Sequence, residues 1–336
     1  METKHIGAQS VAFHSTPGIL ETFSIVGPKE GRGPWGNDFD TILPDEIYGE
    51  KTWEKAERKI LIEGISNVIT SSGFEPNAID FLLAGDLLNQ IISANFAAAS
   101  FPISFFGLYG ACSTIAEALI LGAMLIDGGY AQKVIAAASS HNKTAERQFR
   151  FPIEFGSQRP PTAQWTVTGC GTVLLAAGGP NPKVTCATVG KVVDLGSKDP
   201  NDLGTAMAPA AADTLVTHFR DFAKNTADYD LIVTGDLGRV GSSILAELME
   251  NAGFPFRGNH IDCGISIFAT DEDVHAGGSG CAALAVGYSG YLHKRLLAGK
   301  INKILIAGTG ALLSPLSTQQ NENIPGVCHA VAIEVI

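Results

Sequence analysis

Charged side chains are scarce in this chain. Asp, Glu, Lys and Arg make up only 17% of its 336 residues, whereas an average globular domain has about 25%. Acidic residues outnumber basic ones and the net charge is −11, so the sequence lacks the basic footprint of a nucleic-acid-binding protein. An anionic ligand must therefore be held by local donors, because the overall field repels it. Few charges, 45% hydrophobic residues and 38 glycines together indicate a large buried core with tight turns.

The sequence also lacks paired cysteines and an uninterrupted apolar run of membrane length. None of the six cysteines forms a CxxC pair, so we expect reduced thiols that pack as small core residues. The first residues, Met1–Thr16, do not show the charged-then-apolar pattern of a secretory leader. Residues 87–116 contain no charged side chain, but polar residues and Pro102 interrupt them. We therefore expect buried core here and not a membrane span, and any attachment to a membrane should come from a partner protein.

What the sequence does contain is an internal duplication. Residues 79–88 read IDFLLAGDLL and residues 229–237 read YDLIVTGDL, each a short apolar run that ends in Gly-Asp, as a buried strand before a turn would. A helical pattern precedes each run. The first helix is predicted from Trp53 to about residue 71, and the second from about residue 208 to residue 223, with Pro209 in its first turn.

The parallel continues through the rest of each half. A glycine-punctuated turn, an almost uncharged helix and another strand follow: 113–126 and 133–139 in the first half, 281–297 and 303–308 in the second. The offset between Asp86 and Asp236 is 236 − 86 = 150, whereas that between Lys133 and Lys303 is 303 − 133 = 170. About twenty extra residues therefore lie in the second half, within 254–276.

Alternating strands and helices are typical of a mostly parallel sheet covered by helices. Because the unit is duplicated, we expect two such sheets packed face to face, with the two uncharged helices between them. The predicted fold class is therefore α/β with five layers, helix, sheet, helix, sheet, helix (αβαβα). We place the N-terminal half at residues 1–180 and the C-terminal half at residues 181–336.

This duplicated arrangement resembles the thiolase and ketoacyl-synthase superfamily, in which a nucleophilic Cys begins the first central helix. The segment GACST (110–114) places Cys112 at that point. Backbone N–H groups and the helix dipole at such a position favour an anion, so they would lower a thiol pKa or cradle a carboxylate. The alternative is that Cys112 is a small buried core residue.

The catalytic partners that the resemblance implies are missing from the second half. Where the superfamily has a His after the strand, this chain has Gly235-Asp236, and the later turn reads Gly277-Gly278-Ser279-Gly280 with His275 out of register upstream. A carboxylate beside Cys112 disfavours the thiolate and donates nothing to an oxyanion. We therefore expect the fold without the condensing chemistry.

A closer resemblance, over about residues 27–334, is to the family of stage V sporulation AD proteins. It rests on AGDLLNQ (84–90), GACST (110–114), SSHNKTAERQFRFPIEFG (139–156), CATVGKVVDLG (186–196), AMAPAAADT (206–214), TGDLGRVGS (234–242), HAGGSGCA (275–282) and GTGALLSP (308–315). The resemblance implies a dipicolinic-acid-binding subunit of the spore membrane channel system, attached to the inner forespore membrane, that serves transport of this compound in sporulation and germination.

Dipicolinic acid is a flat pyridine with two carboxylates, so its site needs donors at two ends and an apolar slot between them. The N–H groups at the start of the first central helix and the glycine turn before the second are candidate donors. A cation after strand 133–139, either Arg147 or Arg150, is a candidate for gripping a carboxylate, although this segment is equally typical of a solvated loop or a subunit contact. The candidate ligand-binding residues are Ala111, Cys112, Ser113, Thr114, His141, Asn142, Arg147, Asp236, His275, Gly277, Gly278 and Ser279.

Several alternatives stay open at this point. The chain could be an active acyltransferase or condensing enzyme that uses Cys112, or a structural scaffold for a membrane channel. Dipicolinate often travels as a calcium chelate, and an Asp could meet the calcium through water. No dense loop of oxygen ligands is present, so neither a metal site nor a cofactor is predicted. The expected partners are the ligand or its chelate, the channel subunits and, as the superfamily suggests, a second copy of the chain.

Overall fold

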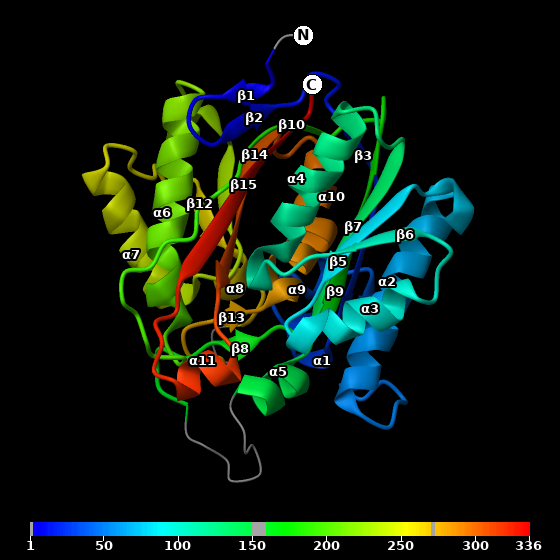
Figure 1. The fold of residues 1–336 in the computed structure, drawn as a ribbon, viewed down its shortest axis with the longest axis horizontal. Coiled ribbons are helices and arrows are strands. Elements are labelled where there is room, and N and C mark those ends of the chain that lie inside the picture. Colours follow the sequence, from blue (N-terminus) through cyan, green and yellow to red (C-terminus); the bar gives the residue numbers. More distant parts are fainter. Residues whose placement is uncertain (1–2, 150–158, 270–272) are drawn as a thin grey trace.

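The computed structural model describes residues 3–149, 159–269 and 273–336, and its strands form two matching sets (Figure 1). In the first set the order is β3 (Gly18–Val26), β9 (Gly169–Ala176), β7 (Lys133–Ser140), β5 (Phe81–Gly85) and β6 (Ser104–Gly107). In the second set it is β10 (Lys183–Thr188), β15 (Gly326–Glu334), β14 (Lys303–Ala311), β11 (Leu231–Thr234) and β12 (His260–Asp262). In each set the last three strands are parallel and the first two run antiparallel to their neighbours.

The two sets are joined where we had expected two separate sheets. Strands β3 and β10 pair at one position, Lys183 opposite Gly18, so the hydrogen-bonded ladder is continuous. The boundary between halves at residue 180 stays a prediction. Shorter elements complete the chain: β1 (His5–Ile6), β2 (Ser10–Ala12), β4 (Thr41–Ile42), β8 (Trp165–Thr166), β13 (Gly278–Ser279), α1 (Pro28–Gly31), α5 (Asn142–Phe149), α8 (Cys263–Ser266) and α11 (Pro315–Gln319).

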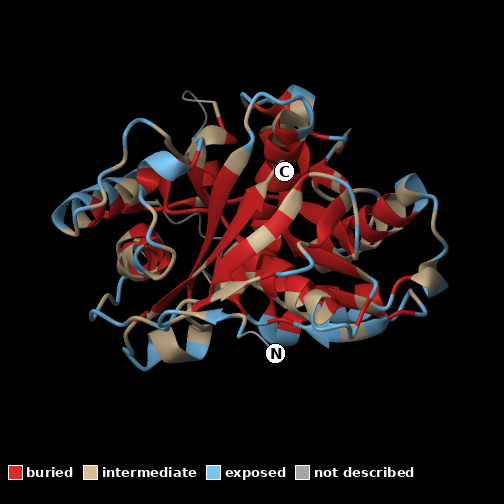
Figure 2. Cartoon of the chain, turned by 90° about the horizontal axis from the view of Figure 1, so that it is seen from above, coloured by how far each residue is buried: buried red, intermediate tan, exposed pale blue. Residues whose placement is uncertain are grey.

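Helices occupy the middle and both outer faces, which gives the predicted five layers. Between the strand sets lie α4 (Thr114–Asp127) and a second helix made of α9 (Cys281–Val286), a π-helical turn (Gly287–Leu292) and α10 (His293–Leu297). Outside the first set lie α2 (Trp53–Ser72) and α3 (Ile92–Ala98), and outside the second lie α6 (Leu203–Asp221) and α7 (Gly238–Asn251). Seen from above, buried residues fill the space between these layers (Figure 2).

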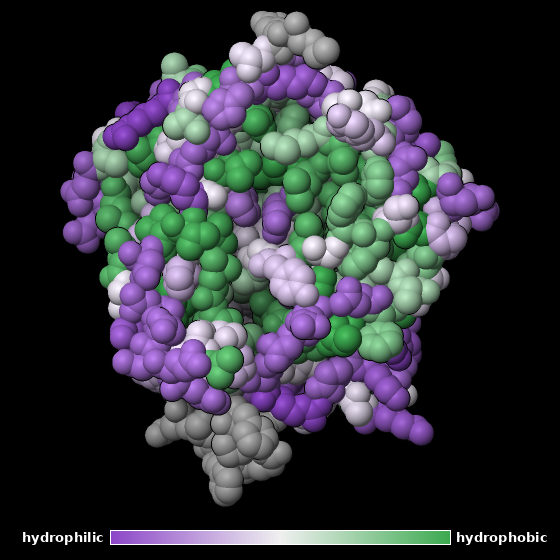
Figure 3. Space-filling model, in the orientation of Figure 1, coloured by the Kyte–Doolittle hydropathy of each residue, from purple (hydrophilic) through white to green (hydrophobic). Residues whose placement is uncertain are grey.

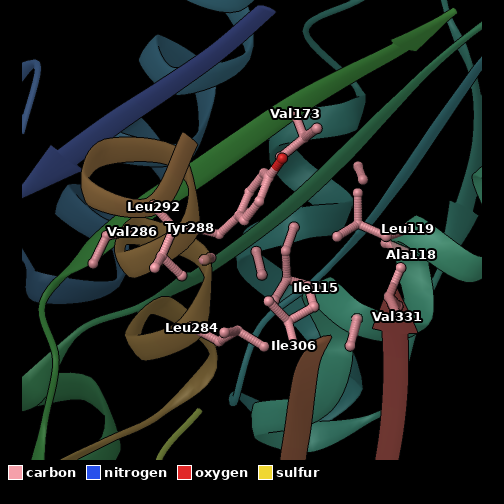
Figure 4. Packing of buried hydrophobic residues seen from close by; sticks show 14 of the residues in the cluster. Ile115, Ala118, Leu119, Val173, Leu284, Val286, Tyr288, Leu292, Ile306 and Val331 are labelled. Carbon is pink, nitrogen blue, oxygen red and sulfur yellow. The ribbon is translucent and has the colours of Figure 1, made fainter. Parts of the chain in front are cut away.

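The central helices are buried through their apolar residues, since α4 and α9 carry few polar side chains. Figure 4 shows Tyr288 and Leu284 of the second central helix beside Ile115 of α4, with Ile306 of β14 next to them. All four residues are fully buried. At about 25 cal/mol per Å² of apolar surface removed from water, this shared core of both halves is the main stabilising term of the fold.

The duplication is visible at single hydrogen bonds. Asp80, before β5, accepts from the backbone N–H groups of Gln132 and Lys133 at 2.7 and 2.9 Å. Asp230, before β11, accepts from Asn302 and Lys303 at 2.7 and 3.0 Å. In both halves one carboxylate therefore fixes the start of the neighbouring parallel strand.

Most predicted elements are confirmed, with one wrong helix start. The helix from Trp53 begins where expected, since the Thr52 side chain accepts from Lys55 N–H at 3.3 Å and caps it. The helix predicted from about residue 208 begins at Leu203 instead. Asp202 caps it by accepting from Thr205 N–H at 3.2 Å, so Pro209 lies inside the helix and not in its first turn.

We had expected the uncharged segment 87–116 to be buried throughout, and this expectation is wrong. The segment's exposed apolar side chains lie on α3, on β6, which is the last strand of its set, and just after β6. Phe96, Phe106 and Tyr109 are 52%, 48% and 62% exposed. None of the helices within the described residues has the length and apolar character needed to cross a membrane.

Removing either repeated carboxylate should destabilise the protein by a similar amount. We expect Asp80→Ala and Asp230→Ala each to lower the free energy of unfolding by about 1 kcal/mol, because each leaves two backbone N–H groups to water. Urea unfolding followed by circular dichroism measures this. Glu75→Ala, an exposed acid in the first half, is the control and should change little. Unequal losses, or losses no larger than the control, would contradict the structural equivalence of the two carboxylates.

Candidate functional site

A cavity of about 500 Å³ opens where the two central helices begin. Its walls come from the turn after β5 (86–91), the residues leading into α4, one side of α5, strands β8 and β13, and the segment 311–317 after β14. Pro200 and Leu203 close one side. The cavity therefore draws its walls from both halves of the duplicated chain.

The residues leading into α4 are held in a tight turn. Ala111 has a left-handed backbone, φ 48°, which is costly for a residue with a Cβ. The Ser113 hydroxyl donates to the Gly110 carbonyl at 2.6 Å, and the Thr114 hydroxyl donates to the Ala111 carbonyl at 2.6 Å. Gln90 and Ile91 on the opposite wall are also left-handed, with φ 55° and 48°. Strained non-glycine residues thus gather around this cavity, as they often do at functional sites.

Cys112 lines the cavity, and its thiol contacts a buried carboxylate behind it. Asp236 accepts from the Thr309 hydroxyl at 2.7 Å and from Gly280 N–H at 3.0 Å, and its third partner is the Cys112 thiol. Burial raises the pKa of Asp236 to about 7. Burial, and then the nearby Asp236 carboxylate, raise the pKa of Cys112 well above its usual value. The thiol is therefore held protonated, which is the opposite of nucleophile activation.

The second half has its own version of this arrangement. Cys281 begins α9, and its thiol donates to the Ala111 carbonyl at 2.9 Å. Burial, followed by Asp86, raises the pKa of this thiol too. Asp86 accepts from Leu88 and Ala94 N–H at 2.8 and 2.7 Å, so it caps the segment after β5. Each half thus supplies a thiol whose pKa is raised by a carboxylate of the other half, and Cys112 also hydrogen-bonds to its carboxylate.

The structure brings part of the predicted site together. Ala111, Cys112 and Ser279 line the cavity. Asp236 lies directly behind Cys112. The Gly277 and Gly278 carbonyls accept from Trp165 N–H and the Gln164 amide at 2.8 and 2.9 Å, so this turn is held by the β8 segment. The remaining members, Ser113 and Thr114, are buried with their hydroxyls turned to backbone carbonyls, and are not lining residues.

Four predicted residues lie elsewhere. Neither His141 nor Asn142 is a lining residue: His141 Nε2 donates to the Glu46 carbonyl at 2.7 Å, and Asn142 N–H donates to the Thr168 hydroxyl at 3.0 Å. The Arg147 Nε donates to Glu54 at 3.0 Å, and its guanidinium lies 5.2 Å from the centre of the Trp53 ring, so it joins α5 to α2. His275 pairs with Asp273 at 3.4 Å. The alternative cation, Arg150, lies outside the described residues.

Sequence reasoning missed most of the cavity wall. The missed lining residues are Asp86, Leu87, Leu88, Asn89, Gln90, Ile91, Tyr109, Ala145, Glu146, Gln148, Phe149, Gln164, Thr166, Pro200, Leu203, Ala311, Leu312, Leu313, Ser314 and Ser317. One signal was available, because AGDLLNQ and GTGALLSP span the carboxyl ends of β5 and β14, where sites of α/β proteins gather. No group of three or more His, Cys, Asp or Glu suited to a metal ion occurs in 3–149, 159–269 and 273–336.

Comparison with known proteins gives a match over almost the whole chain. The model of the family described as stage V sporulation protein AD matches residues 7–334. The curated stage V sporulation protein AD of Bacillus subtilis is 45% identical over 331 residues, which cover 98% of each chain.

Solved structures with the same fold are condensing enzymes. The 3-oxoacyl-[acyl-carrier-protein] synthase III of Aquifex aeolicus superposes with a TM-score of 0.56 at 12% identity, over 95% of this chain and 99% of that one. Cerulenin-bound OleA of Xanthomonas campestris gives a TM-score of 0.63 at 11% identity, over 96% of this chain and 100% of that one. At such low identity the similarity shows the fold alone, which is thiolase-like as predicted.

Asp236→Asn should flatten the pH dependence of stability. The pKa of Asp236 is about 7 in the folded protein, against an ordinary 3.8. Between these pH values the native protein holds a proton that the unfolded chain has released, so the free energy of unfolding falls as pH rises. One such group contributes up to about 1.4 kcal/mol per pH unit in this window. Urea unfolding at a series of pH values measures the slope. An identical slope in the variant would contradict a titrating carboxyl at this position.

Proposed function

The chain belongs to the stage V sporulation protein AD family, and from this premise we propose that it binds dipicolinic acid in the cavity beside Cys112. In this proposal the protein is a subunit of the membrane channel system that loads the compound into the developing spore, and it associates with the forespore membrane through channel subunits. The observation that carries the proposal is the cavity at the start of α4, lined by Ala111, Cys112 and Ser279.

The cavity wall offers what a flat aromatic diacid requires. Tyr109 and Phe149 supply aromatic faces, and Leu312 and Leu313 supply apolar surface, so a ring can be sheltered from water. Ser279 adds a hydroxyl donor. A volume of about 500 Å³ is within the usual range for small-molecule sites and leaves room for a chelated calcium with its water.

The same geometry disfavours the condensing-enzyme alternative. Acyl transfer needs a thiolate at Cys112 and a donor for the oxyanion, whereas the thiol here is protonated beside the Asp236 carboxyl group. No histidine is found among the lining residues that the structure describes. We therefore propose a binding protein that retains the enzyme fold without its reaction.

A second proposal, which follows from the edge of the sheet, is a homodimer. β6 ends its strand set, so one of its edges has no strand partner within the described part of the chain. Phe106 of β6 and Phe96 of the adjacent α3 are exposed, and Figure 3 shows hydrophobic surface on this side of the molecule, at the right of the view. An exposed apolar edge strand is a template for pairing, and two copies can pair through it antiparallel about a twofold axis.

Titration calorimetry with dipicolinate, with and without calcium, tests the binding proposal. The intact chain should bind saturably. Cys112→Trp should weaken binding at least about tenfold because the larger ring fills the cavity. Cys112→Ala is the matched control: it leaves the space open and should bind like the parent, since the thiol is not used as a nucleophile.

No saturable binding by the intact, folded chain would overturn the proposal. Incubation with an acyl thioester, followed by mass spectrometry of the Cys112 peptide, would then test the enzyme alternative. Assembly with channel subunits in the absence of any ligand affinity would support the scaffold alternative.

Phe106→Lys should weaken self-association. A lysine at this edge places a charge opposite its own copy in a twofold pair, so we expect the dimer to dissociate at about a hundredfold higher concentration. Sedimentation velocity over a range of concentrations measures this. Leu297→Lys, at a leucine of α10 that is 62% exposed, is the control and should not change the dimer. A parent chain that is monomeric at all concentrations would contradict the proposal.

A further inference from the structure

Buried charge in this protein is almost entirely acidic. Five acidic residues are at most 3% exposed: Glu30, Glu57, Asp86, Asp236 and Asp262. No Lys or Arg of the described residues is buried. Of these acids, Asp86 lines the cavity, and Asp236 lies behind Cys112, a lining residue that is hydrogen-bonded to it. Glu146 adds a second carboxylate to the wall, and no Lys, Arg or His stands among the lining residues that the structure places. A dianionic ligand that enters this cavity therefore meets carboxylates.

The titratable groups around Asp236 come from several elements, and none is basic. They are Cys112 before α4, Cys281 of α9, Cys263 and Asp262 beside β12, and Cys328 of β15. Around Asp86 they are Glu57 of α2 and Cys281. The remaining partners of Asp236 are a hydroxyl and a backbone N–H. Repulsion between the ligand and these acids can be relieved by a proton.

We propose that binding of an anionic ligand in this cavity is coupled to uptake of one proton from solvent by the Asp236 carboxylate. The inference rests on the proposed function, and it adds how this acidic site accommodates a dianion. The only bond formed is the O–H bond of the neutral Asp236 carboxyl group, and no bond of the ligand breaks. The affinity for the dianion is therefore higher at low pH than at high pH.

Hydrogen-bond geometry selects Asp236 over Asp86 as the proton acceptor. Thr309 and Cys112 both contact Asp236, and a hydroxyl or thiol can turn from donor to acceptor when the carboxyl group becomes protonated. The Asp86 oxygens instead accept from the backbone N–H groups of Leu88 and Ala94. A backbone N–H can only donate, so neither group could accept a hydrogen bond from a protonated Asp86. The pKa of Asp236, raised by burial to about 7, agrees with this choice.

Calorimetry in two buffers tests the coupling directly. Dipicolinate is titrated into the intact chain at pH 8 in phosphate and in Tris, whose ionisation heats differ, and the difference in binding heat gives the number of protons taken up. We expect uptake that approaches one proton and an affinity that falls by up to about tenfold per pH unit above pH 7. Because dipicolinate is a full dianion at this pH, the uptake belongs to the complex and not to titration of the free ligand.

Asp236→Asn should abolish the proton uptake and make the affinity independent of pH, because the amide resembles the protonated carboxyl group. Glu30→Gln is the matched control: Glu30 is also buried, its pKa is also raised to about 7 by burial, and it does not line the cavity. This control should keep the full uptake. If Asp236→Asn does not fold, the two-buffer measurement on the parent chain still shows whether binding takes up a proton, and no uptake overturns the inference.

The outcomes separate this inference from the function on which it rests. No binding at either pH 6 or pH 8 overturns the proposed function. Binding without proton uptake, or uptake that persists in Asp236→Asn, overturns the inference and leaves dipicolinate binding in place. Uptake that disappears only in Asp236→Asn supports both.

Discussion

The rest of this structure depends on two helices beginning at one point between two sets of strands. The turn before α4 contacts the start of α9, since the Cys281 thiol donates to the Ala111 carbonyl at 2.9 Å. This contact requires unusual backbone on both sides: Ala111 is left-handed, and Gly280 has φ 108° with a Cβ position that would lie 2.8 Å from the Ser140 hydroxyl. Each thiol also lies near a carboxylate of the other half, whose charge raises the pKa of the thiol. The cavity is the space that this crowded junction leaves in front of Cys112.

The sequence allowed the fold to be predicted because a duplicated pattern carries its own check. Each apolar run that ends in Gly-Asp had a counterpart in the other half. The repeated hydrogen bonds follow the same offsets, since the acceptors Asp80 and Asp230 are 150 residues apart and the donors Gln132 and Asn302 are 170 apart. The helix start at Leu203 was missed because Pro209 is a common first-turn residue, whereas Asp202 gave the true cap. Propensity alone does not decide between two such signals.

The site was predictable only where a motif lies on the turn itself. Cys112 and Ser279 belong to such motifs, and both line the cavity. Arg147 was a plausible anion ligand by its position after a strand, but its partner Glu54 is 93 residues away and no local pattern reveals that pairing. The walls from 86–91 and 311–317 depend in the same way on how distant turns meet.

The two ends of the strand order differ, and this limits what the protein can build. At one end β6 presents four residues with exposed apolar neighbours, whereas at the other end β12 is only three residues long. Pairing of β6 with a copy of itself uses the same surface on both partners and consumes it. Growth by successive strand addition would need a second apolar edge, and no residue of β12 is an exposed large hydrophobic. In the dimer that we propose, association along the sheet would therefore stop at two copies, and the apolar edge would be protected from forming fibres.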